Sequence, residues 1–385
     1  MGAGVCEDGY VLRSEARVDL GAIRDNVALL RAGTPAELMA VVKADGYGHG
    51  LVPAARAALA GGAAWLGVAF LEEALALREA GIGAPLLSWL AVPGERLVDG
   101  VRRDIDLSIS AVWGLAEVVR AARLAGRPAR LHLKVDTGLS RGGAAGADWP
   151  DLVTAAAKAA ADGDVEIVGI WSHFTYADDP DHPTNARQLA TYREALTVAA
   201  GLGVVPQLRH LANSAATLTL PDAHFDLVRP GIAVYGLSPV PKKSTYGLVP
   251  AMTLRSSVAL AKRVPAGSGV SYGHAYTTAR ETTLALVPLG YADGVPRNAT
   301  NAGPLLLGGR RRTVSGRVCM DQFVVDAGDD EVAAGEEVLL FGPGTAGEPT
   351  AQDWADALGT ISYEIVTRVG PRVPRTYRTY QEIGA

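Results

Sequence analysis

Several reactive side chains in this sequence stand directly after short apolar runs. Lys43 follows the run Met39–Val42 in MAVVKADGYGHG. Lys134, Asp136 and Arg141 follow a later run in LHLKVDTGLSRGG. A lysine amine can form a Schiff base with a carbonyl compound, and neighbouring cations can hold an anion such as a phosphate. Amine chemistry and anion binding would therefore meet wherever the fold brings the ends of these runs together.

Three more apolar runs end in residues of the same kind. His173 follows one run in WSHF, and Asn213 and Ser214 follow the next in HLANSAA. Arg229 and Gly231 follow the last run in LVRPGIAVYG. This set combines an imidazole, an amide, a hydroxyl, a cation and exposed glycine backbone, which the packing of an apolar core alone would not predict.

The apolar runs alternate with helical patterns over about the first 235 residues. The expected strands are Met39–Val42, Trp65–Phe70, Pro85–Leu90, Ile105–Ile109, Leu131–Val135, Val165–Trp171, Gln207–Leu211 and Phe225–Val228. Segments between them, such as LEEALALREAG and VWGLAEVVRAARLAG, have helical periodicity and end in glycine. Eight such alternations favour a closed (β/α)8 barrel of the TIM type, with an open doubly wound sheet as the alternative.

In such a barrel the carboxyl ends of all strands share one rim, and that rim carries the active site. Each reactive residue named above follows an expected strand, so the barrel would gather them. Cations and glycines after the seventh and eighth strands are typical of a phosphate site in this fold. Lys43 alone would be interpreted as a solvated loop lysine. Opposite a phosphate site it indicates pyridoxal phosphate, which a lysine holds as a Schiff base.

The sequence changes character after Tyr235. Strand-like segments separated by Gly, Pro and Asn replace the alternation, among them AMTLRSSVALAKRV and RRTVSGRVCMDQFVVDA, and a helical pattern returns only at AQDWADALG. We therefore expect a cofactor-binding (β/α)8 barrel over residues 14–244 and a mostly β C-terminal domain over residues 245–385 together with residues 1–13. The opening stretch GYVLRSEARVDL is expected to lie against this second domain, with Asp19 as the N-cap of the first helix.

Composition limits the function classes. Of 385 residues, 48% are hydrophobic and 20% charged, the formal net charge is -5 and the isoelectric point is about 5.8. These values indicate a globular protein and favour neither nucleic-acid nor membrane partners. Two cysteines make a disulfide framework improbable and favour a reducing, cytoplasmic setting. The N-terminal residues lack the apolar region of a signal peptide.

The sequence resembles the alanine racemases, the barrel-type pyridoxal-phosphate enzymes. The matching segments, in the family's order, are AVVKADGYGHG, LKVDTGLSRGG, SHF, ANSAA, LVRPGIAVYGLSP, GVSYGHAY, VPLGYADGVPR, GRVCMDQ and ISYEIVTRVGPRVPR. Because they span nearly the whole chain, the set is far more specific than any single motif. The resemblance implies interconversion of L- and D-alanine, a supply of D-alanine for peptidoglycan, and a homodimer whose active sites are shared.

The resemblance also assigns roles. Lys43 would hold the cofactor as an aldimine, and Lys43 and Tyr272 would be the two catalytic bases, Tyr272 reaching the site from the partner subunit. The other cofactor-binding residues that it implies are Tyr47, Arg141, His173, Asn213, Ser214, Arg229, Gly231, Ile232 and Tyr363. No metal is implied.

Further implied roles concern the substrate and the charge of the site. Arg141 and Met320 would contact substrate, and Tyr291 would line the access corridor. Arg229 would face the pyridine nitrogen, with His173 linking it to the tyrosine base. Lys134 matches a lysine that is often carbamylated in the family, a change that turns a cation into an anion.

The physical demands of racemisation agree with these roles. A proton must leave one face of the α-carbon and return to the other, so one base on each face is the simple solution. Lysine and tyrosine both have reference pKa values near 10, and neighbouring cations and hydrogen bonds are needed to lower them. An arginine at the pyridine nitrogen stays protonated and cannot readily accept a proton from it. The cofactor then withdraws electrons less strongly, which limits side reactions.

Three other functions compete with this interpretation. A barrel-type amino-acid decarboxylase is disfavoured because Arg229 replaces an acidic partner of the pyridine ring. A cofactor-carrying regulatory protein is disfavoured by the separate β domain with Tyr272 and Tyr363. A formal G-x-G-x-x-G at Gly342–Gly347 points to a nicotinamide site, but Pro349 stands between this loop and the next helix.

Overall fold

The computed structural model describes residues 12–378 and divides into two compact units. One unit contains residues 23–47 and 51–248, and the other contains the described residues up to 22, residues 48–50 and the described residues from 249. Cys6 and part of the N-terminal segment assigned to the second domain lie outside the described residues. Within residues 12–378, no helix combines the length and apolar character that a membrane crossing requires.

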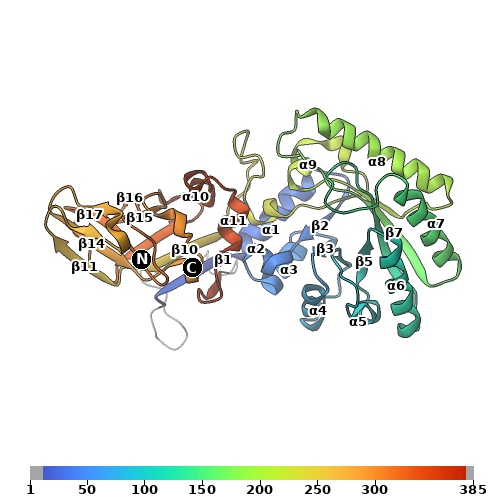
Figure 1. Cartoon of the computed structure of the whole chain (residues 1–385), viewed down its shortest axis with the longest axis horizontal. Coiled ribbons are helices and arrows are strands. Elements are labelled where there is room, and N and C mark those ends of the chain that lie inside the picture. The colour runs from blue at the N-terminus through green and yellow to red at the C-terminus, as the bar shows by residue number, and fades with distance from the viewer. Residues whose placement is uncertain (1–11, 379–385) are drawn as a thin grey trace. The chain divides into compact units, whose positions relative to one another are not determined.

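The first unit is an eight-stranded parallel barrel (Figure 1). Its strands are β2 (Glu37–Val41), β3 (Trp65–Val68), β4 (Leu86–Ser88), β5 (Asp106–Ile109), β6 (Ala129–Lys134), β7 (Val165–Trp171), β8 (Leu208–His210) and β9 (Leu227–Val228). They pair in the order β8-β7-β6-β5-β4-β3-β2-β9. Backbone hydrogen bonds from Asp226 to Arg209 (3.1 Å) and from Arg229 to Ala212 (2.9 Å) join the two ends. The predicted closed barrel is confirmed, and each of the eight predicted strands overlaps an observed one.

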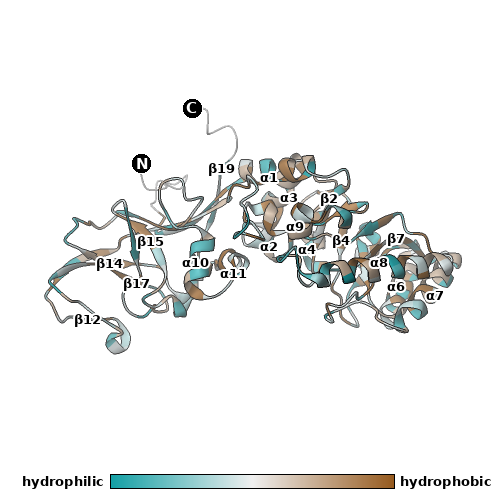
Figure 2. Ribbon diagram, turned by 90° about the horizontal axis from the view of Figure 1, so that it is seen from above, coloured by the Kyte–Doolittle hydropathy of each residue, from teal (hydrophilic) through white to brown (hydrophobic). Residues whose placement is uncertain are grey.

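Helices follow the strands as predicted (Figure 1). They are α1 (Leu20–Ala32), α3 (Leu51–Ala60), α4 (Leu71–Glu79), α5 (Leu97–Arg102), α6 (Val112–Ala125), α7 (Asp148–Ala161), α8 (Pro183–Gly201) and α9 (Ser214–Thr219). In Figure 2, α6, α7 and α8 each carry hydrophobic and hydrophilic residues, as helices that cover a sheet on one side must. Asp19 accepts a hydrogen bond from the Ala22 amide (2.9 Å), which confirms its predicted capping role.

The second unit is mostly β, as predicted. A six-stranded sheet has the order β16 (Arg310–Thr313), β15 (Pro304–Leu307), β18 (Glu337–Phe341), β10 (Met252–Ser257), β1 (Ser14–Asp19) and β19 (Arg375–Arg378). A second sheet contains β11 (Leu260–Val264), β14 (Thr282–Val287) and β17 (Phe323–Gly328), and β12 (Gly269–Val270) pairs with β13 (Tyr276–Thr277). Its α-helices are α10 (Ala351–Leu358) and α11 (Ser362–Thr367) among the described residues.

Strand β1 lies against the second unit, as expected for the opening stretch GYVLRSEARVDL, but the predicted boundary at residue 14 assigns it to the barrel. We placed the start of the barrel at residue 14, but β1 pairs antiparallel with β10 and parallel with β19, so residues 14–22 cluster with the β-rich unit. The partners of β1 are more than two hundred residues away in the sequence. A local hydrophobic pattern can identify a strand but does not specify such distant partners.

Glu15 of β1 forms a buried charge cluster in the six-stranded sheet. Its side chain is 3% exposed and accepts hydrogen bonds from Arg17 (2.6 Å), Arg255 (2.7 Å) and Thr376 (2.7 Å). Burial raises the pKa of Glu15, but the hydrogen bonds from Thr376, Arg255 and Arg17 outweigh burial and bring the pKa to about 2. The carboxylate is thus held ionised and ties β1 to both of its neighbours.

The lowered pKa of Glu15 predicts a loss of stability in acid. A depressed carboxyl pKa contributes stability above the unfolded value near 4.5, and this contribution of on the order of 3 kcal/mol is lost as pH falls from about 4.5 to about 2. We expect Glu15→Gln to lower the free energy of unfolding at pH 7 and to flatten its dependence on pH in this window. The exposed Glu331→Gln is the control. Equal acid sensitivity of Glu15→Gln and the wild type would contradict the assignment.

Candidate active site

Lys43 begins a left-handed turn directly after β2. Residues 44–47 of the segment labelled α2 (Lys43–Tyr47) all have φ between 53° and 60°. Left-handed conformation costs about 1–2 kcal/mol for each residue that has a side chain, so the surroundings must hold the turn. The Gly46 amide donates to the Val42 carbonyl (2.8 Å), and the Leu51 amide donates to the Asp45 carboxylate (2.7 Å).

Glu73 is a further support of this turn. One of its carboxylate oxygens accepts the Ala44 amide (2.6 Å), and the other accepts the amides of Ala69 and Phe70 (3.0 and 3.1 Å). The side chain therefore joins the backbone beside Lys43 to the end of β3. Sequence reasoning missed Glu73, because a glutamate three residues into a helix is read as an ordinary capping residue.

The Lys43 amine lies 6.0 Å from the centre of the Trp89 ring, in a half-buried position. Burial lowers its pKa and the charge of Arg141 lowers it further, while Glu73 opposes both. A lowered pKa increases the fraction of neutral amine, which is the nucleophilic form. The structure thus provides an activated amine at the carboxyl end of the first barrel strand, where the sequence predicted a reactive lysine.

Hydrogen-bond donors gather after β8 and β9. The Ser214 hydroxyl accepts the Gly231 amide (2.7 Å), and Ile232 begins the short helix η2 (Ile232–Tyr235). A Cβ atom on Gly231 would lie 2.2 Å from the Tyr47 hydroxyl, so only glycine allows this approach. Asn213 caps α9 through the Ala216 amide (3.0 Å). The structure therefore brings Tyr47, Asn213, Ser214, Gly231 and Ile232 together as predicted.

Arg229 is buried at the end of β9. Its guanidinium donates to the Ser172 carbonyl (2.8 Å), to His173 Nδ1 (3.3 Å) and to His210 Nδ1 (3.2 Å). Burial lowers the pKa of Arg229 to about 10, so it remains a cation at neutral pH. Burial and the charge of Arg229 lower the pKa of His173 well below its usual value, which keeps this imidazole neutral. The predicted pair of Arg229 and His173 is therefore in contact.

Lys134 and Arg141 add positive charge to the same rim. The Lys134 amine lies 4.3 Å from the centre of the Trp171 ring. Burial, Arg229 and Arg141 lower the pKa of Lys134 to about 8, although Asp136 opposes them. The Asp136 carboxylate accepts the amides of residues 138–140 and so shapes the loop that leads to Arg141, whose side chain is exposed.

The remaining predicted residues belong to the β-rich unit. Tyr272, Tyr291 and Met320 are 71%, 43% and 53% exposed, which is unusual for large apolar side chains. Their segments are joined, since the Ser271 hydroxyl lies 3.3 Å from Cys319 Sγ and the Tyr291 amide donates to the Cys319 carbonyl (3.0 Å). Tyr363 lies in α11 and is half-buried.

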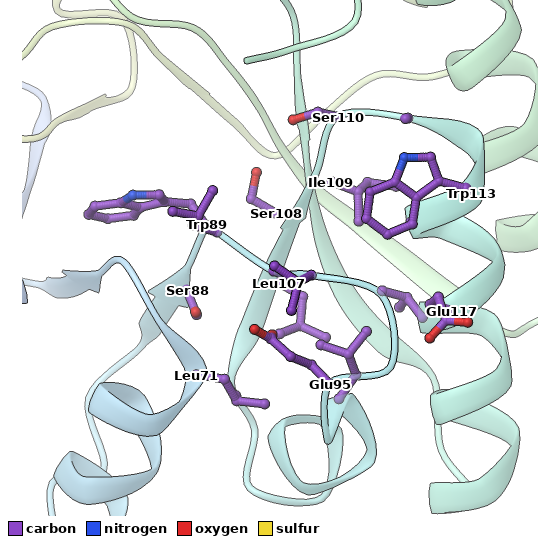
Figure 3. A pocket seen from close by; sticks show the side chains of 17 residues that line it. Leu71, Ser88, Trp89, Glu95, Leu107, Ser108, Ile109, Ser110, Trp113 and Glu117 are labelled. Atoms are coloured by element: carbon purple, nitrogen blue, oxygen red, sulfur yellow. The ribbon is translucent and has the colours of Figure 1, made fainter. Parts of the chain in front are cut away.

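A separate pocket lies between the ends of β4 and β5, with Trp89 and Trp113 on opposite sides (Figure 3). Its empty volume is about 640 Å³, and its charged lining residues are two carboxylates, Glu95 and Glu117. A pocket of this charge does not suit a phosphate. It shares Trp89 with the surroundings of Lys43 but is not the anion site.

The loop at Gly342–Gly347 does not have the structure of a nicotinamide site. It follows β18, and Glu348 accepts the amides of Gly344 and Ala346 (both 2.8 Å), which fills the loop from within. Helix α10 starts only at Ala351, with Thr350 as its cap. In the described range 12–378, no three metal-ligating side chains are grouped.

Two family models of alanine racemase domains and individual alanine racemases resemble this chain. Residues 18–239 match the family model of the alanine racemase N-terminal domain, and residues 251–377 match that of the alanine racemase C-terminal domain. The chain is 67% identical to the alanine racemase of Salinispora arenicola over 95% of this chain and 98% of that protein. It is 61% identical to that of Thermobifida fusca over 94% of this chain and 98% of that protein.

Solved structures agree with these matches. The alanine racemase from D-cycloserine-producing Streptomyces lavendulae has a TM-score of 0.95 and 56% identity, over 96% of this chain and 98% of that chain. The Streptomyces coelicolor A3(2) alanine racemase has a TM-score of 0.92 and 57% identity, over 95% and 98% of the two chains.

Proposed function

This chain belongs to the alanine racemase family, and from that premise we propose that it interconverts L- and D-alanine with pyridoxal phosphate. In a bacterium this activity would supply D-alanine for peptidoglycan. The observation that carries the proposal is the placement of Lys43, with its lowered pKa, on the same barrel rim as the donor set around Gly231. An activated amine and an anion site on one rim match the two ends of this cofactor.

The residues present fit the cofactor. The hydroxyls of Tyr47 and Ser214 and the backbone of Gly231 and Ile232 would surround a phosphate, with the Gly231 amide holding the Ser214 hydroxyl in place and the missing Cβ at residue 231 keeping the approach open. Asn213 holds the start of α9 in place beside them. Arg229 would face the pyridine nitrogen, and Arg141 would donate to the phenolic oxygen. In the β-rich unit, Tyr363 is a further candidate for the phosphate.

When bound, pyridoxal phosphate supplies an aldehyde for covalent attachment and a ring that delocalises the electrons left when the α-carbon loses its proton. Lys43 has two tasks in this proposal. Its amine attaches the cofactor, and the same nitrogen takes or returns the α-proton on one face of the substrate. The burial and the nearby Arg141 charge that lower the pKa of Lys43 favour the neutral amine that both tasks need.

The base for the other face would be Tyr272. Its side chain is 71% exposed in one chain, a position that suits a residue completing the site of a second copy. We therefore propose a homodimer with shared sites, in which the Tyr272 hydroxyl moves the proton on the face opposite Lys43. Met320 would lie near the substrate and Tyr291 would line the access corridor.

Arg229 would set the electronic character of the ring. Its guanidinium has donors only and is held by the Ser172 carbonyl, His173 and His210, so it cannot take a proton from the pyridine nitrogen. Leaving that nitrogen unprotonated weakens the electron withdrawal. Alanine then undergoes racemisation with little transamination.

We expect Lys134 to be carbamylated, because three cations meet there. Burial, Arg229 and Arg141 lower the pKa of Lys134 to about 8, which leaves a reactive neutral fraction at physiological pH. The added carboxylate would pair with Arg141. Intact-peptide mass spectrometry of freshly purified protein should show one added carboxyl group at Lys134. We also expect Lys134→Ala to lose activity and to regain part of it with added small carboxylates. An unmodified Lys134 together with a fully active alanine variant would contradict the prediction.

The function is tested by incubating the purified protein with L-alanine and pyridoxal phosphate and measuring D-alanine and carbon dioxide. We expect D-alanine to form until the two enantiomers are equal, without release of carbon dioxide. Carbon dioxide in place of D-alanine would favour a decarboxylase. The absence of both products from protein that binds the cofactor would favour a regulatory role.

A further inference from the structure

A chain of polar side chains runs through the interior of the barrel to Arg229. Arg229 Nη1 lies 3.2 Å from His210 Nδ1, and His210 Nε2 lies 2.8 Å from His132 Nδ1. His132 Nε2 lies 3.1 Å from Asp106 Oδ2, and Asp106 Oδ1 accepts a hydrogen bond from Arg130 (2.8 Å). Both histidines are fully buried and Asp106 is 1% exposed.

Such a chain is unusual for a barrel core. The inner layers of this fold are normally filled by Val, Ile and Leu, and a buried polar group is costly unless each of its hydrogen bonds is made. Here all four ring nitrogens of His132 and His210 have a partner. The barrel also makes room for the first ring, since a Cβ atom on Gly169 of β7 would lie 2.2 Å from His132 Nδ1.

The two ends of the chain determine where its protons are. Arg229 has donors only, so His210 must present a bare Nδ1 to it and carry its proton on Nε2. That proton points at His132 Nδ1, so His132 must carry its own proton on Nε2, where the Asp106 carboxylate accepts it. Because one end only donates and the other only accepts, a single arrangement of neutral tautomers satisfies every contact.

The opposite tautomer of His210 would harm the site. A proton on its Nδ1 would face the Arg229 guanidinium at 3.2 Å, donor against donor, beside a buried cation. Burial and the Arg229 charge lower the pKa of His210 well below its usual value, which agrees with a neutral ring. The orientation of Arg229 at the barrel mouth thus depends on groups deep in the barrel.

We propose that Asp106 and His132 are positioning residues, which fix the tautomer of His210 and so hold the Arg229 guanidinium at the barrel mouth. The consequence for turnover rests on the proposed function, whereas the tautomers can be observed without it. Neither Asp106 nor His132 touches the reacting atoms. They act through His210, which presents the hydrogen-bond acceptor that orients Arg229.

Two substitutions of His132 by amides of similar size distinguish control of the His210 tautomer from a role in core packing alone. In His132→Asn, the amide oxygen replaces the Nδ1 acceptor that faces His210. In His132→Gln, the longer amide reaches towards Asp106 but leaves the His210 Nε2 proton without its acceptor. Gly169→Ala is a third variant, because it displaces the ring without changing any polar atom. Thermal midpoints of all three show whether each variant folds.

The first readout is nitrogen-15 NMR of histidine-labelled holoenzyme. We expect His132 and His210 in the Nε2–H form in the wild type, and His210 to keep this form only in His132→Asn. His224 is an internal reference, because its Nε2 faces the Thr217 carbonyl (3.0 Å), a contact that none of the substitutions changes directly. An Nδ1–H form of His210 in the wild type, or an unchanged His210 in His132→Gln, would overturn the proposal.

The second readout is the turnover rate together with the cofactor lost to transamination per turnover. We expect His132→Gln and Gly169→Ala to lower kcat by about 10- to 100-fold, the range found when residues that orient metal ligands are removed, and to increase the cofactor lost to transamination per turnover. His132→Asn should retain most of the activity. Equal losses in the Asn and Gln variants that follow their thermal midpoints would reduce His132 to a packing role. If the tautomers are as expected but no variant or wild type racemises alanine, the proposed function fails and the positioning chain remains.

Discussion

Mixing two inactive variants, Lys43→Ala and Tyr272→Phe, should restore about a quarter of the wild-type activity. Lys43→Ala loses both the attachment of the cofactor and one proton carrier, and Tyr272→Phe loses the carrier on the other face. If each site takes its lysine from one chain and its tyrosine from the other, a heterodimer has one intact site and one with both lesions. Random exchange gives about half heterodimers, so about a quarter of all sites are intact.

The control for this experiment uses the double variant Lys43→Ala/Tyr272→Phe. Mixed with Lys43→Ala, it leaves every site without a lysine, so no activity should return. Subunit exchange is followed with two affinity tags, because the expected fraction depends on it. Demonstrated exchange without recovery of D-alanine formation would show that Lys43 and Tyr272 act within one chain, or that Tyr272 is not the second base.

Replacement of Arg229 by glutamate should slow racemisation and increase transamination of the cofactor. The guanidinium donates to Ser172, His173 and His210 from a buried position, and a carboxylate can make none of these contacts. A glutamate would also favour protonation of the pyridine nitrogen, which strengthens the electron withdrawal. We expect racemisation to slow by about a hundredfold or more, the range found when a preorganised donor is removed.

The amount of transamination shows whether Arg229 acts on the pyridine ring of the cofactor. With Arg229→Glu, mass spectrometry of the released cofactor should show more of the aminated form, and a long-wavelength absorbance band should appear during turnover. Arg229→Lys keeps a cation and is the matched control, with an intermediate rate and little transamination. Full activity and an unchanged cofactor spectrum in Arg229→Glu would show that residue 229 does not face the ring.

The sequence predicted the barrel well because its signals are local. Each parallel strand is an apolar run, each helix has its own period, and the residues after the strands have only one rim on which to meet. Lys43, Ser214 and Arg229 were therefore placed correctly from their positions alone. The resemblance to a family added roles that position does not give, above all for Tyr272.

Other features depend on contacts that no pattern encodes. The left-handed turn after Lys43 is held by Glu73, which lies thirty residues further along the chain. His210 follows no motif that marks it as functional, and only the contacts in the folded structure connect it to Asp106 and Arg229. The opening stretch was expected to lie against the second domain, but the boundary at residue 14 left β1 in the barrel, since its strand partners are far away in the sequence.

Borohydride reduction of the cofactor-loaded protein tests the central claim most directly, because it fixes the cofactor to the residue that holds it. The purified protein should be yellow and should lose this colour on reduction. Peptide mass spectrometry should then place the reduced cofactor on the peptide that contains Lys43, and Lys43→Ala should remain unlabelled. Labelling of Lys134 in its place, or no labelling of a protein that racemises alanine, would contradict the assignment of Lys43.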